Sequence, residues 1–257
     1  MDDAQGPRKR SSLDVPLIVV PCFNEAGRWQ PEYWRQLLDS GDVALLFVDD
    51  GSTDTTWELI SATCSSANAA CLRLPRNVGK GEALRNGLLF GIEDRPPIVG
   101  FLDADAAFPS GEVRRLSSMS RDLLGGESYL YDALWSSRVM LAGRDIKRLA
   151  ARHYVGRVIA TAVAPMHGHE IYDTQSGFKL FRSDRRLGEC LAEPFATRWF
   201  PDVELLQRWT RRGFGQMRIW EEPVTGWHDV GGSKMNRSQY RQLLRDMLGV
   251  YRGRVGS

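Results

Sequence analysis

The stretch "VALLFVDDGSTD", residues 43–54, sets the architecture that we expect for this chain. An apolar run without polar alternation ends at Asp49 and Asp50, and the small residues Gly51 and Ser52 then lead into a helical pattern. A continuous apolar strand is typical of a parallel sheet that is covered on both faces. Capping residues directly after its polar end are typical of a strand that leads into a helix. The stretch therefore predicts one strand and helix unit of an α/β fold.

The same pattern occurs on both sides of this stretch. Apolar runs at 16–23 ("PLIVVPCF") and 97–105 ("PIVGFLDAD") predict two more strands, and residues 25–41, 52–66 and 79–94 fill the intervals with helical segments. This alternation predicts an α/β fold with a mostly parallel sheet flanked by helices on both faces. In open sheets of this kind, ligands bind beyond the carboxyl ends of the strands.

The second half of the chain is less regular. It predicts strands within 129–140, 172–183 and 215–224, and helices over 144–164, 202–213 and 238–251. Residues 1–13 are polar and lack periodicity, so we expect a flexible tail there. No internal repeat is visible, and we expect residues 14–257 to form one domain with two functional halves.

Composition and charge exclude several classes of protein. Of the 257 residues, 42% are hydrophobic and 26% are charged, which is typical of an ordinary soluble domain. The formal net charge of +2 gives no support for a nucleic-acid partner. The 4 cysteines show no CxxC pairing, and every apolar run is shorter than the roughly 18 to 20 residues that cross a bilayer. We therefore expect a reduced, cytoplasmic protein without a spanning segment.

Polar residues follow each of the first predicted strands at the same edge of the sheet. Asn24 and Glu25 follow the first strand, Asp50 follows the second, and Asp103 and Asp105 follow the third. Two carboxylates at one strand end can hold a hard divalent cation, and a carboxylate on the neighbouring strand can accept hydrogen bonds from a ribose or a base. Short carboxylates also cap turns and helices, so both interpretations stay open on these residues alone.

The segment "PRNVGKGEALRNG", residues 75–87, adds a feature that suits an anion. Gly79 and Gly81 flank Lys80 at the start of a predicted helix, where free amide groups and the helix dipole favour negative charge. The spacing does not fit a Walker A loop, which argues against a P-loop kinase or NTPase. A plain loop that carries a lysine is the alternative.

These motifs together resemble a known family. "PCFNE", "VDDGSTD", "RNVGKGEALRNG" and "FLDAD", in this order, are similar to the nucleotide-sugar half of glycosyltransferase family 2, which has the GT-A fold. The later "DTQSGFKLFR", "RWFPDVELL" and "GGSK" resemble the branch of dolichyl-phosphate glucosyltransferases and related polyprenyl-phosphate glycosyltransferases. The resemblance runs from residue 16 to about 236 and implies a nucleotide-sugar half over 14–110 and an acceptor half over 111–257.

The resemblance implies that residues at the predicted sheet edge bind the nucleotide sugar. These residues are Pro21, Asn24, Glu25, Asp50, Asn77, Lys80, Gly81, Asp103, Ala104 and Asp105. The DxD pair, Asp103 and Asp105, would hold Mg²⁺ or Mn²⁺ on the diphosphate, so that the cation offsets negative charge on the leaving group. Many relatives continue this motif with a glutamine where this chain has Ala107. His228 is a candidate third metal ligand, and a histidine in an uninvolved loop is the alternative.

The acceptor decides whether a base is needed. Transfer to a hydroxyl requires a general base, for which Asp202 and Asp173 are the candidates, each with a helix cap or a turn as the alternative role. A polyprenyl phosphate, with a second pKa of about 6, is already ionised and can attack without a base. Lys179, Arg182 and Lys234 would then hold its phosphate.

We therefore expect an inverting, metal-dependent glycosyltransferase that moves a hexose to a polyprenyl phosphate. Glucose from UDP-glucose is the favoured donor group, with GDP-mannose and UDP-N-acetylglucosamine as alternatives. Two other functions stay open: transfer to a small molecule, glycan or protein hydroxyl, and a nucleotide-sugar-binding module that has lost catalysis. The basic amphipathic stretch at 144–165 is a candidate for peripheral contact with the inner face of the cell membrane, and an ordinary surface helix is its alternative.

Overall fold

The computed structural model of the chain describes residues 14–147, 171–198 and 200–230. The strands in this part are β1 (Leu17–Cys22), β2 (Ala44–Asp49), β3 (Ala69–Arg73), β4 (Ile98–Leu102), β5 (Ala133–Ser137), β6 (Asp145–Lys147), β7 (Phe178–Arg182), β8 (Ile219–Pro223) and β9 (Gly226–His228). The helices are η1 (Ala26–Arg28), α1 (Pro31–Asp39), α2 (Thr56–Thr63), α3 (Lys80–Glu93), α4 (Ser110–Leu124), α6 (Arg185–Leu191) and α7 (Pro201–Arg211). The predicted tail at 1–13 and the predicted helix at 238–251 lie outside the described residues.

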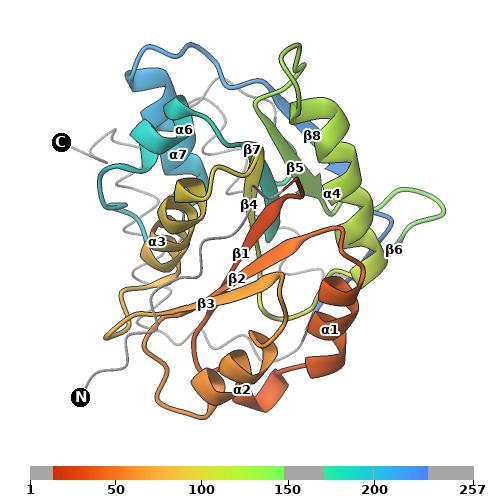
Figure 1. The fold of residues 1–257 in the computed structure, drawn as a ribbon. Coiled ribbons are helices and arrows are strands. Elements are labelled where there is room, and N and C mark those ends of the chain that lie inside the picture. The colour runs from red at the N-terminus through yellow and green to blue at the C-terminus, as the bar shows by residue number, and fades with distance from the viewer. Residues whose placement is uncertain (1–13, 148–170, 199, 231–257) are drawn as a thin grey trace.

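A mixed, mostly parallel sheet forms the middle layer of the fold (Figure 1). Its seven strands have the order β3-β2-β1-β4-β7-β5-β8. All neighbouring strands are parallel except β7, which is antiparallel to both β4 and β5. Strands β6 and β9 pair separately as a two-stranded parallel sheet. The prediction of an α/β fold with a mostly parallel sheet is confirmed.

Helices cover both faces of this sheet, as predicted (Figure 1). On one face, Trp34 of α1, Ile60 of α2 and Val113 of α4 are fully buried against the strands. On the opposite face, Leu84 of α3 and Leu206 of α7 pack in a second apolar cluster. Each fully buried side chain of this kind contributes about 1.5 to 3 kcal/mol through the hydrophobic effect, so both clusters hold the strand ends in fixed relative positions.

The sequence located most of the elements and missed several, and the later predictions at 129–140, 172–183, 202–213 and 215–224 correspond to β5, β7, α7 and β8. The predicted strands at 16–23, 43–50 and 97–105 correspond to β1, β2 and β4, and the helix at 79–94 corresponds to α3. Strand β3 and helices α4 and α6 were not predicted. β3 is a short edge strand that is only partly buried, so its pattern is weak. Helix α4 buries Val113, Leu116 and Leu124 at a helical spacing, a signal that the sequence interpretation overlooked.

Residues 145–147 correct one prediction. We expected them to begin a helix over 144–164, and they form β6 instead, because their backbone pairs with β9. The rest of that predicted helix lies outside the described residues. Within the part of the chain that the structure describes, no helix has both the length and the apolar character needed to cross a bilayer.

Candidate active site

The carboxyl ends of β1, β2 and β4 meet at one edge of the sheet, because these strands are parallel neighbours. Asn24 and Glu25 follow β1, Asp50 follows β2, and Asp103 and Asp105 follow β4. The structure therefore brings together the acidic residues that the sequence assigned to one edge.

The backbone at this edge has an unusual conformation. The φ angles of Asn24 and Ala106 are 52° and 53°, and among the described non-glycine residues only Arg95 shares this property. The left-handed region costs a residue with a Cβ on the order of 1 kcal/mol or more, and such residues concentrate at functional sites. Both turns redirect the chain directly after a strand, next to the predicted ligands.

The DxD pair lies at the centre of this edge. The Asp103 carboxylate accepts a hydrogen bond from Lys80 Nζ at 2.5 Å, and Asp105 Oδ1 accepts one from the Ala107 amide at 3.1 Å. Burial, together with the charge of Asp103, raises the pKa of Asp105. A cation bound between the two carboxylates would relieve this repulsion. Their oxygen ligands fit Mg²⁺ or Mn²⁺, which one or two protein carboxylates commonly hold together with substrate phosphates.

Cationic side chains surround the DxD pair. Arg28 Nη2 donates to Glu25 Oε1 at 2.7 Å, and this pairing, with smaller contributions from Asp105 and Asp103, raises the pKa of Arg28. Burial opposes the charge of Arg138, yet nearby carboxylates that include Asp103 and Asp105 still raise its pKa. Three cations, Lys80, Arg28 and Arg138, thus lie within electrostatic reach of the pair. This edge can bind an anionic ligand and a divalent cation side by side.

Sequence reasoning missed Arg28 and Arg138. Arg28 stands three residues after Glu25, and this spacing in a loop rich in motif residues was the available signal. Arg138 follows β5, and its proximity to the DxD pair depends on the position of that strand in the sheet, which no local pattern in the sequence reveals.

The two candidate bases both pair with cations. Asp202 is 6% exposed and forms an ion pair with Lys179. Asp173 is 4% exposed, and its two oxygens accept hydrogen bonds from the Arg138 side chain at 2.7 and 2.8 Å. Each carboxylate therefore balances the charge of a largely buried cation.

Lys179 and Arg182 do not lie where we predicted. Lys179 is 1% exposed, donates to the Thr174 carbonyl at 2.7 Å and lies 4.3 Å from the centroid of the Trp135 ring. Because β7 runs antiparallel to β4, Arg182 pairs with Ile98 at the far end of that strand. Lys179 is thus part of the core, and Arg182 lies at the opposite edge of the sheet. The sequence does not reveal the direction of β7, which decides the place of Arg182, or the packing of β7 against α7, which buries Lys179.

Asp50 anchors the loop that precedes α3. Its carboxylate is 2% exposed and accepts hydrogen bonds from Val78 N at 2.7 Å, Gly79 N at 2.9 Å and Asn77 Nδ2 at 3.0 Å. Burial raises the pKa of Asp50, although these bonds and the charge of Arg198 oppose the shift. The structure thus gives Asp50 a role in holding the loop, and its contact with a nucleoside stays a prediction.

The two glycines beside Lys80 make room for another segment. Gly79 has φ +97°, and a Cβ there would lie 2.8 Å from Arg198 Cγ. A Cβ on Gly81 would lie 2.9 Å from the Thr197 carbonyl oxygen. The close approach of this segment accounts for both glycines, which the sequence interpretation had assigned to the border of an anion site.

His228 is adjacent to the DxD segment through its backbone alone. Its amide donates to the Ala107 carbonyl at 3.0 Å, whereas its ring Nε2 lies 3.0 Å from Asp145 Oδ2. In the ranges that the structure covers, no three His, Cys, Asp or Glu side chains are grouped as metal ligands, so the predicted set of Asp103, Asp105 and His228 is not assembled.

The other predicted ligands divide between the site and the core. Pro21 lies in β1 at its carboxyl end, half-buried. Ala104 is 7% exposed and packs in the apolar cluster below the DxD turn. Lys234 lies outside the described residues.

Comparisons with known proteins agree with this geometry. Residues 17–121 match the family described as Glycosyl transferase family 2. A glucosyl-3-phosphoglycerate synthase of Mycobacterium tuberculosis, solved in complex with UDP, superposes with a TM-score of 0.62 over 93% of this chain and 80% of its own, at 22% identity. The fold is thus that of the GT-A glycosyltransferases.

Relatives that are similar in sequence indicate a narrower class of enzyme. A dolichyl-phosphate beta-glucosyltransferase of Trichomonas vaginalis is 28% identical over 246 residues, which cover 91% of this chain and 69% of the relative. The dolichyl-phosphate beta-glucosyltransferase of Saccharomyces cerevisiae is 29% identical over 242 residues, covering 85% and 68%. Residues 17–121 thus form a glycosyltransferase family 2 domain.

Proposed function

We propose that this glycosyltransferase transfers glucose from UDP-glucose to a polyprenyl phosphate, with inversion at the anomeric carbon and with a divalent cation held by Asp103 and Asp105. One observation carries the proposal: these two carboxylates share the carboxyl edge of the sheet with the cations Lys80, Arg28 and Arg138. Such a mixed set suits a diphosphate that is bound through a metal ion.

Several residues of this edge contribute to the binding of the donor diphosphate. When bound, the divalent cation would offset negative charge on the leaving diphosphate. Lys80, whose Nζ lies 2.5 Å from Asp103, adds a positive charge at the same position. Glu25 holds the guanidinium of Arg28, which interacts electrostatically with Asp105 and Asp103. The choice of UDP-glucose is supported by a similarly folded synthase that was solved with Mn²⁺ and UDP-glucose.

The state of the two aspartates supports a phosphate acceptor. Asp173 pairs with Arg138 and Asp202 pairs with Lys179, so both candidate bases are already committed to ion pairs. A polyprenyl phosphate needs no base: one of its oxygens forms the bond to the anomeric carbon while the bond to the diphosphate breaks. In place of Lys179 and Arg182, we assign the acceptor phosphate to Arg138, whose charge acts at the DxD pair. The names of the relatives agree with this acceptor.

A transfer assay tests the proposal. Purified protein is incubated with UDP-[¹⁴C]glucose and either dolichyl or undecaprenyl phosphate in detergent, with Mn²⁺, Mg²⁺ or EDTA. We expect labelled glucose in the organic phase only when metal and lipid phosphate are both present, and a β linkage by NMR. Label that moves only to a soluble acceptor such as phosphoglyceric acid, or that is released equally without lipid, would overturn the acceptor assignment.

We also propose that the enzyme meets its acceptor at a membrane surface through the basic stretch at 144–165, of which only 144–147 are described. Basic side chains near anionic headgroups contribute roughly 1 kcal/mol each. Sedimentation with vesicles checks this. We expect binding to vesicles that contain anionic lipid, a decrease at high salt, and none to purely zwitterionic vesicles; the same binding to both vesicle types would argue against an electrostatic contact.

A further inference from the structure

Residues 192–198 form a short segment between α6 and α7, which we call the strap. Two arginines donate hydrogen bonds to the carbonyl groups at its beginning. Arg208 of α7 donates to the Glu193 carbonyl at 2.6 Å and to the Pro194 carbonyl at 2.5 Å. Arg85 of α3 donates to the Ala192 carbonyl at 3.5 Å. The strap is thus fixed between two helices of the same face of the sheet.

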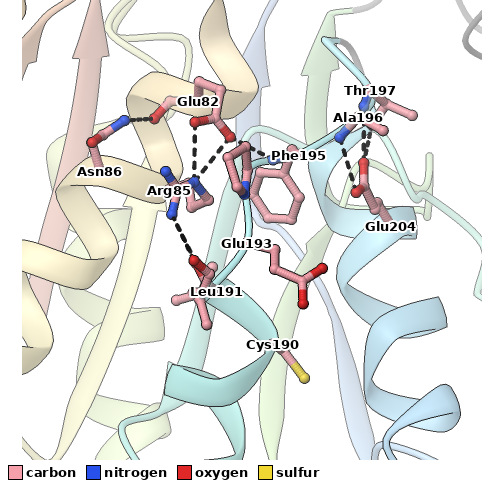
Figure 2. Close-up of polar contacts among 12 residues, drawn as sticks. Glu82, Arg85, Asn86, Cys190, Leu191, Glu193, Phe195, Ala196, Thr197 and Glu204 are labelled. Carbon is pink, nitrogen blue, oxygen red and sulfur yellow. Dashed lines mark hydrogen bonds and ion pairs between the residues drawn. The ribbon is translucent and has the colours of Figure 1, made fainter. Parts of the chain in front are cut away.

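Two carboxylates hold the amide groups that follow. Glu82 of α3 accepts from the Phe195 amide at 2.5 Å, and Glu204 of α7 accepts from the Ala196 and Thr197 amides at 3.0 and 2.9 Å (Figure 2). Glu204 is fully buried. Burying an ionised carboxylate costs several kcal/mol unless it is paired and hydrogen-bonded, so the network tolerates little displacement of the strap.

The strap ends at Arg198, next to the loop that Asp50 anchors. Arg198 Nη2 donates to Asn77 Oδ1, and the charge of Arg198 acts on Asp50. The missing side chain of Gly79 leaves the space that the Arg198 stem occupies. Two separately anchored segments therefore meet at this guanidinium. The next residue of the loop is Lys80, which contacts Asp103.

We propose that Arg198 binds the diphosphate of the donor, and that Glu204 is a positioning residue that keeps Arg198 beside Asn77. This inference rests on the proposed function and adds a residue to its donor site. Arg198 is exposed and permanently charged, and its stem packs against Gly79, the residue before Lys80, which contacts Asp103. A guanidinium matches two phosphate oxygens at once, which a nucleoside does not offer.

A charge series of ligands tests the contact. Isothermal titration with uridine, UMP and UDP in the presence of Mn²⁺ is compared for the wild type, Arg198→Gln and Arg198→Lys. Arg185→Gln removes the same charge from a side chain that is 86% exposed on α6 and serves as the matched control. We expect Arg198→Gln to weaken UDP about 10- to 100-fold, as for the loss of a charged hydrogen bond, and to leave uridine unchanged. Arg198→Lys should retain part of the affinity.

Two results would overturn the inference: an unchanged UDP affinity in Arg198→Gln, or an equal loss for uridine and UDP. If the proposed function itself is wrong, the wild-type protein should bind no nucleoside diphosphate. That result would overturn both the proposed function and the role of Arg198. For the positioning role, Glu204→Gln should raise KM for the donor while KM for the lipid acceptor stays constant. A merely structural role would lower the melting temperature and leave the UDP affinity of the folded fraction unchanged.

Discussion

At the residue scale, the position of Asp103 depends on a glycine 74 positions later in the chain. The Asp103 amide donates to the Gly177 carbonyl at 2.9 Å, and a Cβ on Gly177 would lie 2.4 Å from Asp103 Oδ2. The side chain of an alanine at position 177 would clash with the Asp103 carboxylate in its present position. The glycine of "DTQSGFKLF" is therefore needed by the DxD motif, a link that no pattern within either segment expresses.

We expect Gly177→Ala to displace this carboxylate and to lower kcat/KM roughly 100-fold, the effect of a misplacement of about 1 Å in an active site. Circular dichroism should show a retained fold. Gly188→Ala on α6 is the control, because a Cβ there meets no atom within 4 Å. Full activity of Gly177→Ala would show that the position of Asp103 tolerates displacement.

Cys71 provides a prediction about pH. A hydrogen bond from Cys64 lowers the pKa of the Cys71 thiol to about 7, against burial. Because the thiolate is the reactive form, alkylation of Cys71 by iodoacetamide should rise with pH around a midpoint near 7, measured by peptide mass spectrometry. Cys64→Ala should move the midpoint upward. Burial raises the pKa of Cys190 to about 11, so this thiol should stay unmodified, and a midpoint near 9 for Cys71 would contradict the account.

At the element scale, the sequence predicted residues that directly follow apolar strands better than residues whose position depends on distant segments. Asp103, Asp105 and Asp50 were identified because a polar end on a buried strand is visible locally. Arg138 was missed, since its partner Asp173 comes from another segment. Lys179 was misassigned because its residue type suits a phosphate, whereas its burial against Asp202 depends on how β7 and α7 pack.

The ion pair between Lys179 of β7 and Asp202 of α7 should contribute measurably to the free energy of unfolding. Lys179→Met leaves the Asp202 carboxylate buried without its cation, so the free energy of unfolding should fall by about 3 to 5 kcal/mol. The double variant Lys179→Met with Asp202→Leu removes both charges and should recover part of this loss. Urea denaturation of the three proteins gives the comparison. A double variant that is no more stable than Lys179→Met would contradict this expectation.

At the scale of the whole molecule, the active-site edge is close to electrically balanced. Six carboxylates stand against five cations: Glu25, Asp50, Asp103, Asp105, Asp173 and Asp202 against Arg28, Lys80, Arg138, Lys179 and Arg198. A diphosphate that entered alone would bring uncompensated negative charge to buried groups. We therefore expect a divalent cation and the nucleotide to bind together, each strengthening the affinity for the other.

The most direct test of this central claim is the thermal unfolding of the wild type and of Asp105→Asn with UDP, with Mn²⁺ and with both. Asp42→Asn, at a surface ion pair with Arg114, is the control variant. With both ligands at about 100 times Kd, binding to the folded state stabilises the wild type by about 2.7 kcal/mol, which corresponds to a rise in Tm of roughly 5 to 11 °C. The account predicts that this rise requires Mn²⁺, is retained in Asp42→Asn and disappears in Asp105→Asn. An equal rise with UDP alone, or in Asp105→Asn, would contradict it.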